Sequence, residues 1–440
     1  MKGVSGSGTG AVMTMAAPRW LPLALLGLLA TAIALGGGVA PGATALLCLL
    51  TGAIGLVAAS SRRLPPLPPA VWGLALVWSG VALASIIWGP QLDVSLDGSA
   101  AAICASLVWM LGAALVDGRA RRHFVIGLAI CGAVVAILAL AEAVPGQPAA
   151  IPLGNPNHLA AWLLLPGSLA LVALLYSEPT GRGNGESAFL WFGLVGIIGA
   201  GIAAAASRGA SLAAGLALAA LLILYLFGPR RGILVGASGI VAAALILLLA
   251  PAPGFLPVEA GGRETSAAMQ WAAYATSASA ALDLMPLGAG IGAFASSFEP
   301  YGSSSIPHAA SFSHGAPLHG LVQLGLPFLA VLAVTVWVAI LAARGILSRP
   351  RNPRCTWGAV IAILSLSAHS LIDVPLDVPA IALSGAALAG LAFAGIGIGE
   401  EKQRTLDRVG SGSPTRSIVA GLSIALLALG ASQAAILATW

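Results

Sequence analysis

The sequence predicts an all-α protein that crosses a membrane with about 12 or 13 helices, and three observations support this class. First, 58% of the 440 residues are hydrophobic and 8% are charged, with a mean hydropathy of +0.97. The surface of a soluble protein of this length would need far more charge. Second, apolar runs of about 20 residues, long enough to cross the hydrocarbon core, recur along nearly the whole chain. Third, basic residues gather in every second connection between these runs, as in polytopic membrane proteins.

The apolar runs divide the chain into blocks. The blocks are a Gly/Ser/Thr-rich disordered leader at 1–18, nine spans within 19–250, an extracytoplasmic segment at 251–318, three spans within 319–398, a basic cytoplasmic loop at 399–416 and a last span within 417–440. The expected spans are 20–35, 43–59, 71–88, 99–116, 124–144, 158–176, 188–206, 210–227, 232–250, 319–343, 357–372, 378–398 and 417–438.

The distribution of basic residues predicts the orientation of the chain. If the amino terminus is cytoplasmic, all but two of the 20 Lys and Arg residues fall on the cytoplasmic side. Because Lys and Arg accumulate there in membrane proteins, we expect a multi-pass protein of the cytoplasmic (inner) membrane, with segment 251–318 and the carboxyl terminus outside. The excess of positive charge then reflects topology, and no nucleic-acid partner is expected.

The two exceptions to this charge rule, Arg208 and Arg263, are candidate anion-binding residues. Arg208 lies in the short turn Ser207-Arg208-Gly209 between two apolar spans, and Arg263 lies in the extracytoplasmic segment. An arginine that faces lipid at mid-membrane costs about 2.5–3.5 kcal/mol, and less near the interface. A snorkelling side chain is the structural alternative for Arg208, and an exposed ion pair with Glu264 is the alternative for Arg263.

Five of the six histidines also fall on the predicted outer side. His158 opens a span in Gly154-Asn155-Pro156-Asn157-His158, where Asn157 is the expected N-cap. That helix start is explained equally well by capping and by binding of an anion to free N–H groups. His314 and His319 precede or begin another span. The functional and structural interpretations of this pair are also equally open.

His369 and Asp373 lie four residues apart at the outer end of a span, so they share a helix face and can form a hydrogen bond. Ionisable groups at the edge of a membrane are costly, which indicates a purpose. A structural lock between helices is the equal alternative.

Other patterns in the chain indicate structure rather than a cofactor. The stretch around Trp271 and Tyr274 predicts an amphipathic helix on the membrane surface. Gly288-Ala289-Gly290-Ile291-Gly292 superficially resembles a dinucleotide-binding loop, but no strand precedes it, so we reject that interpretation. The four cysteines are scattered singly, and the His spacing fits no zinc site. No metal and no cofactor are therefore expected.

Several segments occur together in an order that resembles one known family. They are GNPNHLAAWLLL, SRGASLAAGLAL, an outer arginine, PLGAGIGAF, a pre-span histidine segment and HSLIDVPLDVPA. This ordered set, over about residues 150–395, resembles the O-antigen ligase/polymerase family of bacterial envelope glycosyltransferases. Relative to the family, Gly315 stands in place of an Asn and Gln323 in place of a Glu.

The resemblance implies a GT-C-like membrane enzyme of polysaccharide or lipopolysaccharide biosynthesis. Such enzymes move a glycan from an undecaprenyl-diphosphate donor to an acceptor hydroxyl on a glycan, lipid or protein at the outer face of the cytoplasmic membrane. The matching positions are Arg208 and Arg263 for the donor diphosphate and His314 for catalysis. His158, His319, His369 and Asp373 are possible supporting residues.

Elementary chemistry is compatible with these roles. A diphosphate leaving group needs concentrated positive charge, and arginine binds phosphate oxygens in a bidentate manner. The acceptor hydroxyl needs a base, and histidine titrates near neutral pH. The main alternative is a secondary transporter or flippase of a lipid-linked or anionic substrate, although transporters place their polar residues at mid-membrane. A non-catalytic envelope-assembly protein is the third hypothesis.

Overall fold

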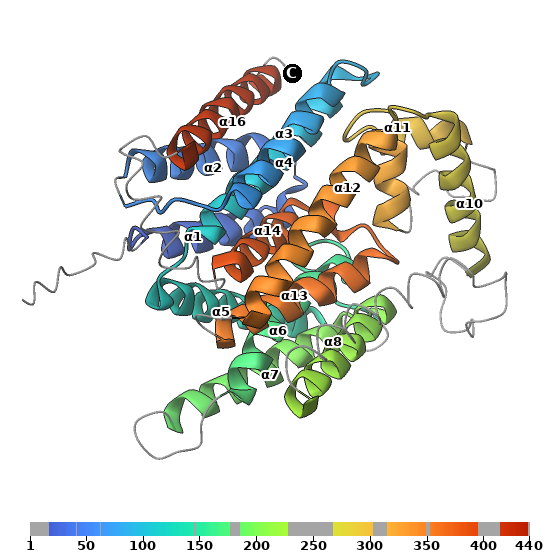
Figure 1. The fold of residues 1–440 in the computed structure, drawn as a ribbon. Helices are drawn as coiled ribbons and strands as arrows, with labels where there is room; N and C mark the ends of the chain where they lie inside the picture. Colours follow the sequence, from blue (N-terminus) through green and yellow to red (C-terminus); the bar gives the residue numbers. More distant parts are fainter. Residues whose placement is uncertain are drawn as a thin grey trace, which may run out of the picture.

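The computed structural model describes residues 17–40, 42–61, 63–144, 147–176, 185–227, 267–301, 315–348, 353–394 and 414–438. Within these ranges every regular element is a helix, and the only strand-like pairing is an isolated bridge between Val144 and Gln147. The all-α class is therefore confirmed for this part of the chain (Figure 1).

The helices follow the expected spans in order. The expected span at 232–250 lies outside the described residues. The helices are α1 (Leu21–Ala34), α2 (Ala43–Ser60), α3 (Pro69–Ser85), α4 (Leu92–Ala113), α5 (Gly118–Glu142), α6 (Pro156–Leu175), α7 (Gly185–Ala204), α8 (Arg208–Phe227), α10 (Ala267–Asp283), α11 (Phe294–Phe298), α12 (Ala316–Ser348), α13 (Pro353–Ser370), α14 (Pro379–Ala394) and α16 (Pro414–Ala438), with 3₁₀ turns η1 (Gly36–Gly38), η2 (Glu299–Tyr301) and η3 (Pro375–Asp377).

Six of the described helices, α2, α4, α5, α6, α12 and α16, are long and apolar enough to cross a membrane. Shorter apolar helices lie at α1, α3, α14, the greater part of α7 and the first 15 residues of α8. The chain therefore has the architecture of a helical, multi-pass membrane protein. The number of crossings and the GT-C-like arrangement remain predictions.

Contacts between helix ends agree with an up-and-down order. At one end the Leu67 N–H donates to Thr415 Oγ1 over 3.0 Å, and Arg121 donates to the Ala394 carbonyl. At the other end Gly38 packs against Pro379, and Gly209 packs against His369. We call the first the basic end, since Arg121 lies there, and the second the histidine end. The charge pattern predicts that the basic end faces the cytoplasm.

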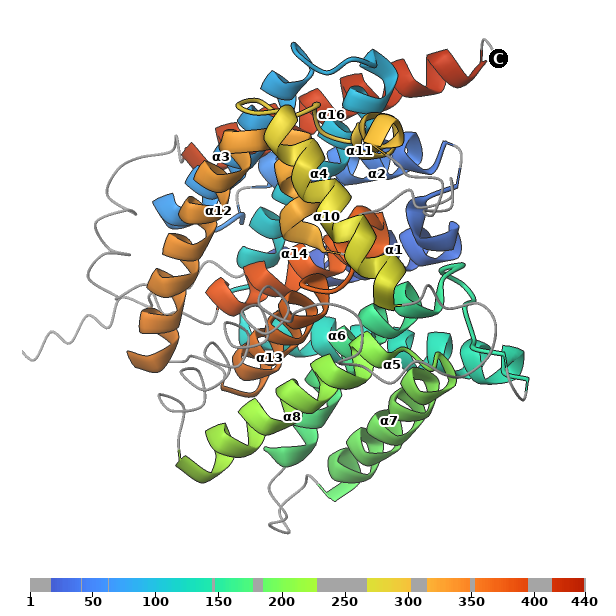
Figure 2. The same ribbon diagram turned by 90° about the vertical axis from the view of Figure 1, so that its right-hand side faces the viewer.

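The centre of the bundle is formed by α4, α6, α13 and α14 (Figure 1). The indole of Trp162 on α6 is fully buried and donates to Ser384 Oγ on α14 over 3.0 Å. Further along α14, Gly390 packs directly against the backbone of α4. Small residues permit such close approach of membrane helices. The helices α2 and α16 pack together on one side of this centre, with α7 and α8 on the opposite side (Figure 2).

Helix α12 is broken near its beginning, at Gly325 and Pro327. Gly325 has φ 53° and ψ −134°, a conformation that side chains other than glycine rarely adopt. Such a break leaves carbonyl groups without helical partners, and these groups need other donors where water is excluded. The following 23 residues, 326–348, extend about 34 Å, which suffices to cross a bilayer. This length predicts that the break lies close to one membrane edge.

The glycine-rich loop 288–292 supplies the missing donors. The Ala289 N–H donates to the Val322 carbonyl over 2.9 Å, and the Gly290 N–H donates to the Gln323 carbonyl over 2.7 Å. On its other side the loop meets the end of α3, where the Ile291 N–H donates to Ser85 Oγ. This close backbone packing accounts for the glycine spacing without a nucleotide.

We expect Gly325→Ala to destabilise the folded protein by about 2–4 kcal/mol, because it adds backbone strain and a Cβ overlapping the Pro286 carbonyl oxygen. The matched control is Gly215→Ala on α8, where an added Cβ meets no atom within 4 Å. Thermal unfolding of both purified variants in detergent checks this. Equal melting temperatures would contradict the interpretation of the break as a tightly packed site.

The predicted orientation is open to cysteine labelling at two exposed positions, Glu299 in η2 and Arg63 before α3. In intact cells, a membrane-impermeant maleimide should modify Glu299→Cys and leave Arg63→Cys unmodified until the membrane is opened. The native cysteines are buried or half-buried, and the unsubstituted protein gives their background. The reverse labelling pattern would overturn the orientation.

Candidate functional site

Three buried histidines and two aspartates gather at the histidine end. His158 lies in the first turn of α6, His319 in the first turns of α12 and His369 in the last turn of α13. Their exposed fractions are 9%, 4% and 1%. Asp373 and Asp377 lie in the connection between α13 and α14. We call these five residues the histidine–aspartate cluster.

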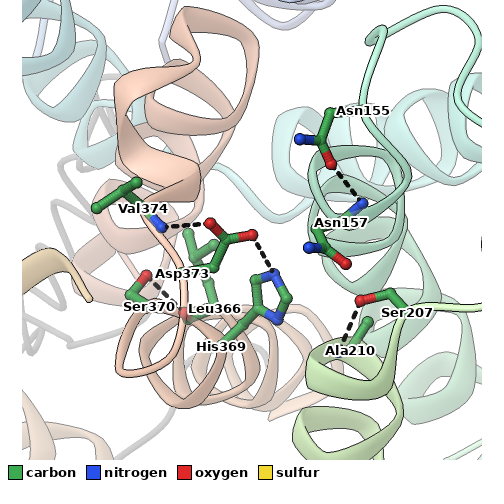
Figure 3. Close-up of polar contacts among 9 residues, drawn as sticks. All are labelled: Asn155, Asn157, Ser207, Ala210, Leu366, His369, Ser370, Asp373 and Val374. Carbon is green, nitrogen blue, oxygen red and sulfur yellow. Dashed lines mark hydrogen bonds and ion pairs between the residues drawn. The ribbon is translucent and has the colours of Figure 1, made fainter. Parts of the chain in front are cut away.

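The pair His369 and Asp373 is present, as its spacing predicted, but its geometry is that of an ion pair rather than a hydrogen bond. The distance between His369 Nε2 and Asp373 Oδ2 is 3.6 Å (Figure 3). Helix α13 ends at Ser370, so Asp373 lies in the turn beyond it, where its Oδ1 accepts from the Val374 N–H over 2.8 Å. The Ser370 hydroxyl donates to the Leu366 carbonyl within α13.

The electrostatics of Asp373 favour its carboxylate form. Burial alone raises the pKa of this carboxyl, but His369 and the Val374 N–H together outweigh burial and hold the pKa below its usual value. A carboxylate that stays ionised in a buried position can stabilise positive charge on a neighbouring imidazole. The pair therefore places a fixed negative charge beside the His369 imidazole.

The sign of this pKa shift predicts how acid affects the fold. A lowered pKa means that the carboxylate contributes stability above its unfolded pKa of about 3.9, and that this contribution is lost as pH falls through the folded pKa. Asp373→Asn should therefore lose less thermal stability than the parent protein between about pH 5 and 3. The exposed Asp93 provides the control, Asp93→Asn. An acid profile unaltered by Asp373→Asn would show that this carboxylate is not stabilised by the fold.

A second pair, His319 and Asp377, was not predicted from the sequence. His319 Nε2 lies 2.6 Å from Asp377 Oδ2 and 2.7 Å from the side-chain amide of Gln323. Phe294 stacks on the imidazole, with ring centroids 4.3 Å apart and planes inclined by 24°. The available signal was the second acidic residue of HSLIDVPLDVPA, four positions beyond Asp373. The predicted supporting residue His319 is thus held from three elements: α12, η3 and α11.

His158 lies next to these pairs, and the start of its helix differs from the prediction. The N-cap is Asn155, not Asn157, because Oδ1 of Asn155 accepts from the Asn157 N–H over 2.8 Å (Figure 3). Pro156 occupies the first helical position and keeps Asn155 extended, with ψ 127°. His158 is close enough to Asp373, His369 and Asp377 to interact with them electrostatically.

Arg208 is the first residue of α8, beside the histidine–aspartate cluster. The preceding Ser207 caps the helix, since its Oγ accepts from the Ala210 N–H over 3.2 Å (Figure 3). Gly209 packs so closely on His369 that an added Cβ would lie 3.0 Å from Cε1 and 3.1 Å from Nδ1 of the ring. The Arg208 side chain is exposed. The structure therefore brings together Arg208, His158, His319, His369 and Asp373 among the predicted residues.

Two predicted residues, Arg263 and the predicted catalytic His314, lie outside the described part of the chain. Gly315, which follows His314 in sequence, is described. An added Cβ at Gly315 would lie 3.0 Å from Tyr274 Cε1 and 3.1 Å from the Leu371 carbonyl oxygen, so a larger side chain would require its neighbours to shift.

A helix, α10, covers the stretch around Tyr274, and its location on the membrane surface stays a prediction. The Tyr274 hydroxyl donates to the Leu371 carbonyl over 3.1 Å, and burial, reinforced by Asp373, raises the pKa of Tyr274. Tyr274 therefore acts as a neutral hydrogen-bond donor here. The bond ties α10 to the connection that carries Asp373 and Asp377.

The histidine–aspartate cluster has the chemistry of proton transfer. A buried imidazole paired with a carboxylate can accept a proton and be stabilised in its charged form. Within the described residues, no group of three or more His, Cys, Asp or Glu side chains is arranged to hold a metal ion. The sequence matches no model of a known protein family, and no curated protein shows significant similarity to it.

Proposed function

We propose that this protein is a bacterial envelope glycosyltransferase that moves a glycan from an undecaprenyl-diphosphate donor to an acceptor hydroxyl. The observation that carries the proposal is the meeting of two imidazole–carboxylate pairs with the Arg208 turn at one end of the helix bundle. The resemblance to the O-antigen ligase/polymerase family supplies the substrate class. The charge pattern favours a position of this end outside the cytoplasmic membrane.

The proposed reaction needs a base for the acceptor hydroxyl and positive charge for the leaving diphosphate. The acceptor oxygen forms a bond to the anomeric carbon of the donor glycan, while the bond from that carbon to the diphosphate oxygen breaks. Undecaprenyl diphosphate leaves with the bonding electrons, and the hydroxyl proton passes to a histidine base. In this assignment Arg208 and Arg263 bind the diphosphate, whose negative charge increases as the bond breaks.

The base assigned by the resemblance is His314. We assign a supporting role to the histidine–aspartate cluster. His319 is fixed by Asp377 and Gln323, and His369 is fixed against Asp373 and Gly209. These contacts restrict the side chains to one arrangement, which favours precise alignment of reacting groups. His158 adds a third buried imidazole within electrostatic range of the same two carboxylates.

The transporter alternative draws support from the broken helix α12, because broken helices form the substrate sites of many transporters. Such sites lie near the middle of the membrane. Here the break at Gly325 leaves 23 residues on one side, enough for a full crossing. The polar groups near it, His319 and Gln323, thus lie toward the helix end, which favours surface chemistry. A non-catalytic assembly protein would need no such buried proton-transfer pairs.

A deletion strain tests the proposed function. Cells without this protein should accumulate undecaprenyl-diphosphate-linked glycan on the outer face of the cytoplasmic membrane, together with unmodified acceptor. A plasmid-borne copy should remove both. Accumulation on the inner face would instead indicate a flippase. Normal glycan and lipid intermediates would exclude both hypotheses.

A further inference from the structure

An open depression of about 470 Å³ lies at the basic end, over the first turns of α5. Among the described residues, it is lined by Gly118, Arg119, Arg122, His123 and Ile126. These residues gather on one side of the helix, because each lies three or four positions from at least one other member. The depression therefore presents two arginines and a histidine side by side, far from the histidine–aspartate cluster in the up-and-down order of the bundle.

The charges around the depression are arranged to receive an anion. Arg121, between the two lining arginines, is buried and donates to the Ala394 carbonyl over 3.4 Å. The nearby carboxylate of Asp117 caps the helix by accepting from the Ala120 N–H over 3.1 Å. Arg119 and Arg122 are instead exposed. Two guanidinium groups three residues apart can share one phosphate group.

An apolar stripe continues from this basic depression along α5. Its members are Ile126, Ile130, Val134 and Ile137, spaced by four, four and three residues. The last three are 46%, 52% and 52% exposed. From Ile126 to Ile137 the helix rises about 16 Å, which is close to half the thickness of the hydrocarbon core. The stripe thus matches one leaflet, with its cationic head at the membrane surface.

From this arrangement we infer that α5 carries a binding site for an anionic diacyl phospholipid of the cytoplasmic leaflet. The phosphate of the headgroup binds Arg119 and Arg122, and an acyl chain lies along Ile130 and Val134. A basic recess continuous with an apolar helix face fits a lipid better than a free anion, since a free anion makes no use of the stripe. The inference goes beyond the proposed glycan transfer and does not depend on it.

Native mass spectrometry of the full-length protein in detergent tests this site, with phosphatidylglycerol as probe and phosphatidylcholine as the zwitterionic comparison. The double variant Arg119→Ala/Arg122→Ala should bind phosphatidylglycerol about 30-fold more weakly, equivalent to about 1 kcal/mol for each arginine. Binding of phosphatidylcholine should change little. The matched control, Arg63→Ala/Arg344→Ala, removes the same charge from exposed positions elsewhere near the basic end and should retain phosphatidylglycerol binding.

Three results would overturn the inference. Equal losses in the test and control variants would mean that diffuse charge, rather than this site, attracts the lipid. Full retention in Arg119→Ala/Arg122→Ala would remove the arginines from the site. Displacement of phosphatidylglycerol by millimolar inorganic phosphate, with no effect of Ile130→Ser, would indicate a free-anion site. Because Arg119 and Arg122 are exposed, their replacement should leave folding intact, and an unchanged melting temperature verifies this.

Discussion

Replacing Arg208 by alanine should lower glycan transfer by about 10²–10³-fold, the loss typical when one group that stabilises developing negative charge is removed. Arg208 begins α8 in a turn whose next residue, Gly209, is pressed against the His369 ring. Its backbone position is therefore fixed beside the proposed site. Arg208→Lys retains the charge but loses the planar fork, so its activity should also fall sharply.

Arg263→Ala should give a loss similar to that of Arg208→Ala, because both arginines are assigned to the same diphosphate. Arg344→Ala is the control, since it removes an exposed charge near the end of α12 that lies away from His319. Initial rates with a lipid-linked donor, normalised to folded protein, compare the four variants. Full transfer by Arg263→Ala, or equal losses in Arg344→Ala, would contradict the diphosphate assignment.

Removing the imidazole of His314 should lower transfer by about 10²–10⁴-fold, the usual contribution of general acid–base catalysis. The loss should depend on pH in the range where histidine titrates, so rates are compared from pH 5 to 9. His319→Ala is the informative comparison. If His319 only supports the site, its replacement should reduce transfer less than that of His314 and leave the shape of the pH profile unchanged.

Asp377→Asn separates positioning from catalysis, because it keeps the size of the side chain that lies 2.6 Å from His319 but removes its charge. A supporting role predicts similar, modest losses in Asp377→Asn and His319→Ala. Loss confined to His319→Ala, with His314→Ala fully active, would move the base to His319. Undiminished transfer in both histidine variants would exclude both residues and direct attention to Asp373.

Apolar runs predicted the positions of the helices well, because a long apolar segment in a membrane must satisfy its backbone groups internally, as a helix does. The largest shift is at α4, which begins at Leu92 rather than near 99. The helix includes Asp93 and Asp97, whose charges interrupt the apolar run, so the run begins later than the helix. The i and i+4 spacing of His369 and Asp373 predicted that the two side chains meet, but they form an ion pair across the end of α13 rather than a hydrogen bond on one helix face.

What sequence reasoning missed depends on contacts between distant segments. The pairing of His319 with Asp377 joins α12 to η3, and no spacing rule connects them. The break at Gly325 was also not predicted, because an apolar run containing one Gly and one Pro is compatible with an unbroken span. The partners that make the break tolerable lie in loop 288–292, far away in sequence. The N-cap was misplaced by two residues because Asn155 and Asn157 are both good caps.

The central claim is that the protein breaks the bond between glycan and lipid diphosphate. The most direct measurement uses purified protein in liposomes made with membrane lipids of the deletion strain, which supply accumulated donor and unmodified acceptor. Mass spectrometry follows free undecaprenyl diphosphate and the size of the acceptor. The expected result is release of undecaprenyl diphosphate in step with extension of the acceptor, lost in Arg208→Ala. Movement of the intact donor across the bilayer, with its glycan–diphosphate bond unbroken, would contradict the claim and identify a transporter.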